Sequence, residues 1–284
     1  MNWIMLGILV IISSSTMYLA LRVAKERSKP IEIQNLALFF IPTLLYLFYN
    51  IIFKIGLEIE IKYLIIIFGA AVLFSWLGNI FSLKAIQTAN NPGYSLMIQK
   101  SYTILTTILS VFLFSSQIKI KSIVAIIIVI FFMSFIVLDK KENKESKNVW
   151  ILYTIGAFFA FAFLSLTLTY LGKKGIESTV INFYLCLFVT IIIFIQLLAK
   201  SIKFEFTKSN TSIILGVGVP SAVFNLCLIN GYKIAPNPGY ISAANAGSIA
   251  LLTVLYSIFF KDSLTTKKII GVIGILIGLI ILFV

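Results

Sequence analysis

The sequence predicts an all-α integral membrane protein with ten transmembrane helices, arranged as an inverted repeat of five plus five. Composition, ten long apolar runs and one repeated motif support this prediction. Hydrophobic residues make up 60% of the 284 residues and charged residues 12%, whereas globular domains are about half apolar and about a quarter charged. A chain this apolar cannot cover a soluble core with polar surface, so we expect it to lie in a lipid bilayer.

The apolar runs define the expected spans. A helix needs about 20 apolar residues to cross a hydrocarbon layer roughly 30 Å thick. The runs show no alternation of period two and are too long for barrel strands, which favours helices. The first run lacks the basic start of a signal peptide, so we expect it to be retained. The ten runs cover residues 2–21, 33–53, 63–88, 92–114, 121–138, 149–171, 178–199, 210–233, 238–260 and 267–284.

The motif Asn-Pro-Gly-Tyr at 91–94 recurs at 237–240. With the same 146-residue offset and no gap, residues 79–138 match 225–284 at 13 positions. We therefore expect two five-helix repeats, residues 1–138 and 149–284, joined by the hydrophilic linker 139–148. Because five is odd, the second repeat enters the membrane from the other face. Inverted repeats of this kind are typical of alternating-access transporters with a site near the bilayer midplane.

Basic residues predict the orientation of the chain. The span ends and loops that follow odd-numbered runs carry fifteen Lys and Arg residues, and those that follow even-numbered runs carry seven. The positive-inside rule therefore predicts a cytoplasmic linker and both termini outside, in the cell membrane. All the basic residues behind the net charge of +13 except Lys100 lie in these loops and span ends, so no nucleic-acid partner is expected.

The repeat and its motifs resemble the drug/metabolite transporter superfamily and, more narrowly, the EamA family. The resemblance covers the whole chain and is most specific in the two Asn-Pro-Gly turns and the helices after them, LTTILSVFLF (105–114) and LLTVLYSIFF (251–260). Lys261 and Asp262 stand where many members have Gly-Glu, whereas Ser115 and Ser116 depart from that pattern. The resemblance implies secondary transport of amino acids, drugs or other metabolites, including efflux. Many relatives have cytoplasmic termini, which disagrees with the charge count.

The Asn-Pro-Gly turns suit helix starts. Asparagine is a good N-cap, proline fits the first helical position, and glycine allows close backbone approach. A structural turn is therefore one interpretation. The other is a gate, or a helix N-terminus that directs partial positive charge at a solute. The residues concerned are Asn91, Pro92, Gly93, Asn237, Pro238 and Gly239.

Lys100 is the most unusual candidate for solute binding. It lies eight residues after Pro92, roughly 12 Å from the helix start at the α-helical rise. A lysine at this depth is costly and usually faces an aqueous cavity or a partner, and the spans hold no acid to pair with it. Snorkelling toward the interface is the alternative. We expect a cavity in which Lys100 meets a carboxylate, a phosphate or helix C-terminal carbonyls.

Polar residues on the first, third, fourth, eighth and ninth runs are further solute-binding candidates. Gln99 and Asn245, for example, are 146 residues apart and so match in depth. Alternatively, such residues bond between helices for packing. The predicted set is Gln99, Tyr102, Trp76, Asn79, Asn225, Asn245, Ser248, Ser14 and Tyr18. Gly274 and Gly278 form a GxxxG pattern, for which packing inside the bundle is favoured over a dimer contact.

The sequence contains no histidine, and its acids fall in loops or at span ends, which weakens enzyme interpretations. Cys186 and Cys227 lie in apolar runs and are expected to be packing residues, so no metal or cofactor is predicted. The leading hypothesis is a secondary-active transporter of small organic solutes, amino acids or related metabolites, around a midplane cavity. The alternatives are an intramembrane lipid-group transferase and a non-transporting scaffold. Besides the solute and the lipid bilayer no partner is expected, and the chain is a monomer or homodimer.

Overall fold

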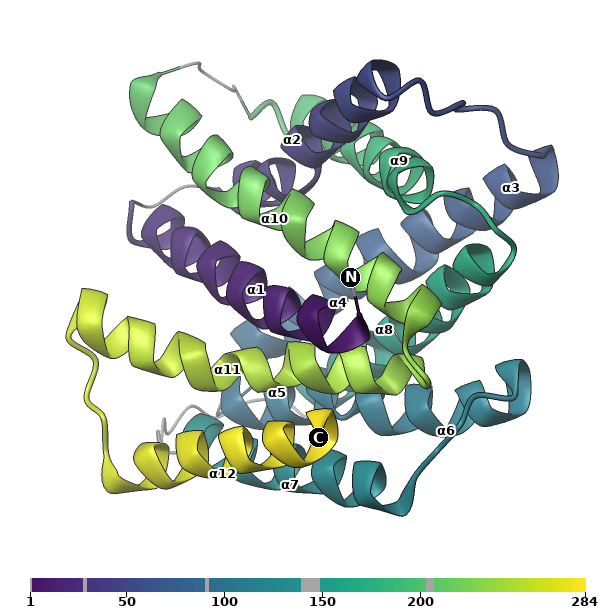
Figure 1. Ribbon diagram of the computed structural model, residues 1–284. Helices are drawn as coiled ribbons and strands as arrows, with labels where there is room; N and C mark the ends of the chain where they lie inside the picture. The colour runs from purple at the N-terminus through teal and green to yellow at the C-terminus, as the bar shows by residue number, and fades with distance from the viewer. Residues whose placement is uncertain (1, 28–29, 90–91, 139–148, 203–206) are drawn as a thin grey trace.

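A computed structural model describes residues 2–27, 30–89, 92–138, 149–202 and 207–284 (Figure 1). Within these ranges the regular structure is helical and contains no strand. Ten helical segments are long and apolar enough to cross a membrane, which confirms the predicted all-α membrane fold. The predicted linker 139–148 and Asn91 lie outside the described residues.

The first five spans agree with the predicted runs to within a few residues, but two of them are interrupted. A π-helical segment, η1, divides the third span, and a turn at Ser101 divides the fourth. The elements are α1 (Trp3–Glu26), α2 (Ile31–Ile52), α3 (Ile61–Gly69), η1 (Ala70–Trp76), α4 (Leu77–Thr88), α5 (Pro92–Lys100), α6 (Tyr102–Phe114) and α7 (Ile120–Val137). Ser95–Phe114 still forms one span, in agreement with the predicted run over 92–114, but the turn makes Lys100 the last residue of α5.

The last five spans are uninterrupted helices. Pro220 lies inside one of them, as Pro42 does in α2. A proline in a membrane helix is tolerated because neighbouring helices and side chains satisfy the freed carbonyl. The elements are α8 (Val149–Lys173), α9 (Ser178–Ala199), α10 (Lys208–Ile234), α11 (Pro238–Phe260) and α12 (Thr266–Phe283).

Helices at corresponding places in residues 1–138 and 149–284 make corresponding contacts. The first helix of one half, α1, packs against α10 and α11, and the first helix of the other half, α8, packs against α4, α5 and α6. The second helices, α2 and α9, pack against each other, as do the fifth helices, α7 and α12 (Figure 1). At the α2–α9 contact the hydroxyls of Thr43 and Thr190, 147 residues apart, lie 3.3 Å from each other. Corresponding helices thus make corresponding contacts.

The glycines of the last helix pack inside the chain. A Cβ at Gly274 would overlap the ring of Phe132 on α7, and one at Gly278 would lie 2.8 Å from Val129 Cγ2. Only glycine allows α12 to approach α7 this closely. The GxxxG pattern therefore serves contact within the bundle, as predicted. Both cysteines are buried and free, which agrees with a packing role.

The spans alternate in direction, so helices α1, α7, α9 and α11 end at one face of the molecule. We call this the basic face, because the fifteen basic residues counted above follow the odd-numbered spans. In Figure 1 the ends of α1 and α11 lie at the left. The other face, with the connections 53–60, 115–119, 174–177 and 235–237, is called the opposite face.

Candidate functional site

A cavity of 440 Å³ lies inside the bundle, and both repeats contribute to its wall. The wall draws on α1, α2, η1, α4, α5, α6, α8, α9, α10 and α11. Tyr18, Leu21, Gln34 and Ile86 belong to helix ends near the basic face, whereas Asn182 lies near the start of α9 at the opposite face. The cavity therefore extends through much of the depth of the bundle, with predominantly apolar walls and a few polar groups.

Lys100 is in the cavity wall, half-buried at the end of α5. Its ammonium nitrogen lies 5.9 Å from the centroid of the Tyr18 ring, within the range of a cation–π contact. None of the ion pairs among the described residues involves Lys100, and no described residue of the wall is a carboxylate. An anion that enters the cavity would therefore meet a cation without an acidic partner in the described part of the chain.

Six further predicted residues share this wall: Asn79, Tyr102, Asn225, Asn245, Ser248 and Tyr18. Two of their amides are already held by nearby groups. The Asn225 nitrogen donates to the carbonyl of Ser221 at 2.9 Å, and the Asn245 oxygen accepts from the Ser14 hydroxyl at 3.2 Å. The fourth and ninth spans both supply polar residues to this one wall.

Three predicted residues do not line the cavity. Gln99 is buried between helices, where its nitrogen donates to Ser95 at 2.7 Å and its oxygen accepts from Ser82 at 2.6 Å. Trp76 donates to the side chain of Gln196 on α9 at 3.2 Å. Ser14 lies behind the wall and contacts Asn245 and Ser248. For these residues the packing alternative describes the contacts better, because each bonds to another helix, although the Gln99 nitrogen bonds to Ser95 on its own helix.

Two asparagines of the wall, Asn35 on α2 and Asn182 on α9, were not among the sequence candidates. They are 147 residues apart, the same offset as Thr43 and Thr190. Asn182 is fully buried, and neither its amide nitrogen nor its oxygen has a hydrogen-bond partner among the described residues. An offset of 147 residues between α2 and α9 aligns Asn35 with Asn182 and Thr43 with Thr190. The offset of 146, which fits the later helices, places each pair one position out of register.

The second Asn-Pro-Gly turn joins the start of α11 to α6 near the opposite face. Asn237 caps α11 by accepting from the Gly239 backbone N–H at 2.8 Å, and its nitrogen donates to the Thr107 carbonyl of α6 at 3.1 Å. A Cβ at Gly239 would overlap the Thr107 hydroxyl and lie 2.9 Å from Thr107 Cα. The predicted cap, the helix-starting Pro238 and the close approach at Gly239 are therefore confirmed. In the first turn, Pro92 begins α5 and Gly93 follows it.

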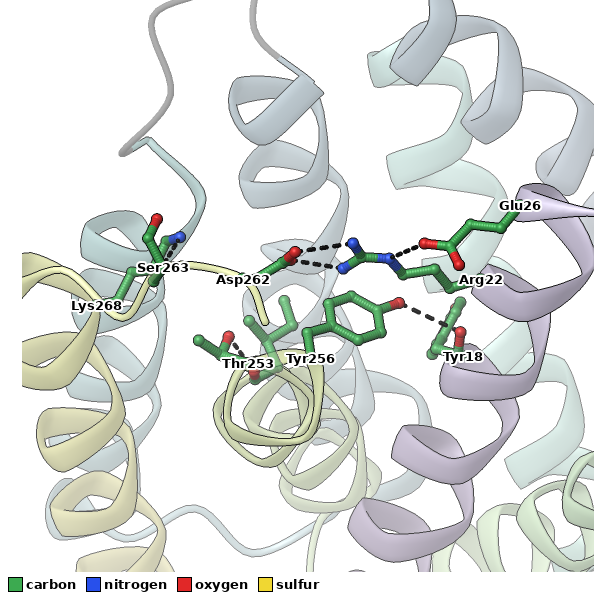
Figure 2. Close-up of polar contacts among 9 residues, drawn as sticks. Tyr18, Arg22, Glu26, Thr253, Tyr256, Asp262, Ser263 and Lys268 are labelled. Carbon is green, nitrogen blue, oxygen red and sulfur yellow. Dashed lines mark hydrogen bonds and ion pairs between the residues drawn. The ribbon is translucent and has the colours of Figure 1, made fainter. Parts of the chain in front are cut away.

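An ion pair joins α1 to the end of α11 at the basic face. The Arg22 guanidinium donates to both Asp262 carboxylate oxygens, at 2.6 and 2.9 Å. Its central carbon lies 4.5 Å from the Tyr256 ring centroid and 4.2 Å from that of Phe260. Figure 2 shows Arg22 between Asp262 and Glu26, with the Tyr256 hydroxyl directed to the backbone of Tyr18. Because Tyr18 and Tyr256 both line the cavity, this pair fixes the helices beside its basic-face end.

No protein-family model matches the sequence, and no curated protein matches it. The structure matches 28 chains of solved structures. One of them, described only as "Crystal structure of protein", has a TM-score of 0.82 and covers 99% of this chain and 96% of that chain at 13% sequence identity. At this identity the likeness shows the fold alone. The chain is thus a multi-pass, all-α membrane protein whose fold occurs in other solved structures.

Proposed function

We propose that the protein is a secondary-active transporter, which moves small organic solutes across the membrane by alternating access to the cavity. The observation that carries this proposal is the cavity wall, which contains Lys100 and no carboxylate among its described residues. Ionisable groups inside a membrane protein are costly and usually mark a pathway for a solute or ion. A solute with an anionic group would supply the missing partner. Amino acids and related metabolites, their N-acyl derivatives and other organic anions included, are the first candidates.

The packing of the two halves supports alternating access. Two packing units combine elements of both halves. In one unit α1 packs on α10 and α11 of the second half, and in the other α8 packs on α4, α5 and α6 of the first half. Rocking of two such units against each other around a fixed site is the usual mechanism of inverted-repeat transporters. The Asn237–Thr107 contact joins them near the opposite face, while wall residues such as Leu21 and Ile86 reach helix ends at the basic face. The described conformation is therefore assigned as closed at the opposite face.

The sequence resemblance to the EamA family supports the same function. Under this proposal the protein lies in the cell membrane as a monomer or homodimer. The charge distribution favours a basic face in the cytoplasm and both termini outside.

Flux in proteoliposomes tests the proposal. Purified protein is reconstituted and offered labelled amino acids, N-acyl amino acids and other organic acids, with proton and sodium gradients in either direction. At least one solute is expected to accumulate in vesicles that contain protein and not in protein-free vesicles. Lys100→Gln should reduce flux of anionic solutes at least tenfold while the protein remains folded. No flux of any solute under any gradient would overturn the transporter function, whereas normal flux in the variant would remove only Lys100 from the site.

A further inference from the structure

Asn182 has an unusual environment for a buried amide. Its side chain is fully buried, both of its polar atoms lack a hydrogen-bond partner among the described residues, and the residue lies in the cavity wall. Most buried polar groups in proteins are hydrogen-bonded, because an unsatisfied group loses its hydration without compensation. Because Asn182 borders the cavity, a molecule in the cavity is the candidate partner of the amide, and the wall must shift to admit it, since no part of the residue is accessible in the described conformation.

Asn50 provides a comparison. Its amide nitrogen also lacks a partner among the described residues, but its oxygen accepts from the Thr179 hydroxyl at 2.6 Å. Asn50 is not in the cavity wall. The Asn50 oxygen thus joins α2 to α9, which explains why a buried asparagine is present at this position. Asn182 makes no such contact, so packing between helices does not explain its amide.

Asn35 places a second amide in the same wall, from the corresponding helix of the other repeat. Lys100 adds a cation from α5. Lys100 on α5 and Asn182 on α9 thus contribute a charged group and an unsatisfied amide to one cavity. The wall also contains apolar residues, Phe161, Leu164 and Leu168 among them.

Resting on the proposed function, we infer that Asn182 is a solute-binding residue, and that the solute is an organic anion with an apolar body and an uncharged hydrogen-bonding group. The carboxylate of the solute pairs with Lys100. Its neutral group, an amide or hydroxyl, bonds to the Asn182 amide, which can donate and accept at once. A free ammonium finds no carboxylate among the described wall residues, so a net anion is preferred to a zwitterion.

Binding of four matched probes to the purified, full-length protein tests this inference without requiring transport. N-acetyl-leucine carries the anion, the apolar body and the amide. Its primary amide, N-acetyl-leucinamide, lacks the charge, 4-methylpentanoate lacks the amide, and leucine is the zwitterion. Affinities are measured by isothermal titration calorimetry in nanodiscs. We expect N-acetyl-leucine to bind at least tenfold more tightly than each of the other three.

Asn182→Leu keeps a γ-branched side chain but removes both polar atoms. This variant should bind N-acetyl-leucine and 4-methylpentanoate with equal affinity, because only the contact to the probe amide is lost. Its unfolding midpoint should not fall, since no internal hydrogen bond is removed. Asn50→Leu is the control, which should lower the midpoint and leave the order of affinities unchanged. Lys100→Gln should abolish the preference for N-acetyl-leucine over N-acetyl-leucinamide.

Two results would overturn the inference. One is no binding of N-acetyl-leucine, or binding no tighter than that of leucine. The other is an unchanged preference for N-acetyl-leucine over 4-methylpentanoate in Asn182→Leu. The proposed function fails separately: binding with the expected order but no flux of any solute would refute transport and leave the role of Asn182 intact.

Discussion

The Asn237 side chain donates to the Thr107 carbonyl at 3.1 Å, which joins the start of α11 to α6 near the opposite face. The backbone N–H of Gln117 donates to the Pro236 carbonyl at 3.1 Å beside it. These contacts connect the fourth span of one repeat to the turn before the ninth. The second of the two turns therefore does more than start a helix, because it also joins the two halves near the opposite face, where the proposed transport cycle has this conformation closed.

Gly239→Ala should weaken this closure. The added Cβ would overlap the Thr107 hydroxyl and press on its backbone, so α11 and α6 must separate. We expect a cysteine at Asn225, in a background without Cys186 and Cys227, to react at least several-fold faster with a membrane-impermeant thiol reagent from the opposite face. Gly69→Ala is the control, since nothing lies within 4 Å of its added Cβ. Equal labelling rates in both variants would show that this contact does not close the opposite face.

Two glycines on α10, two residues apart, should respond differently to alanine. A Cβ at Gly218 would overlap Ile41 and lie 2.9 Å from the Ala37 carbonyl oxygen on α2, whereas one at Gly216 meets nothing within 4 Å. Overpacking usually destabilises by about 1–3 kcal/mol, and removing an exposed helical glycine stabilises by roughly 0.5–1 kcal/mol. Thermal unfolding in detergent should therefore give a lower midpoint for Gly218→Ala and an equal or higher one for Gly216→Ala. The reverse order would contradict the close packing of α10 on α2.

Asp262→Asn should loosen α1 from the end of α11. The change removes the charge partner of a partly buried arginine that packs between two aromatic rings. Charge-assisted, bidentate pairs are stronger than ordinary surface pairs, so we expect a loss of about 1–2 kcal/mol in the free energy of unfolding. Glu60→Gln, which breaks the exposed pair with Lys62, should have no measurable effect. Equal effects of the two substitutions would mean that Asp262 contributes no more than a surface charge.

The fold could be predicted from the sequence because each membrane helix is encoded by one continuous stretch of apolar residues. Apolar runs of about 20 residues report membrane helices directly, and the Asn-Pro-Gly motif specifies a cap, a first helical residue and a close approach. The break at Ser101 could not be predicted in this way. Residues 95–114 contain no proline or glycine that would mark a break.

The candidate site was only partly predictable. Lys100 is recognisable in the sequence because a cation in an apolar run is rare. Gln99, one residue earlier, is also polar, but its side chain is hydrogen-bonded to Ser82 and Ser95 and does not line the cavity. Which polar residue faces a cavity depends on helix rotation, which the sequence does not fix. Asn182 stands out only once its missing partners are known, since buried asparagines with partners are common in helix packing.

Access to the cavity from each side of the membrane tests alternating access most directly. A single cysteine at Asn225, in the wall contributed by α10, is exposed to an impermeant thiol reagent on one side or the other of sealed vesicles of uniform orientation. A transporter should be labelled from the basic face without solute and from both faces during solute exchange, and Lys100→Gln should abolish the solute-dependent labelling from the opposite face. Alternating access would be contradicted if the cysteine were labelled from only one face, both without solute and in the presence of each transported solute.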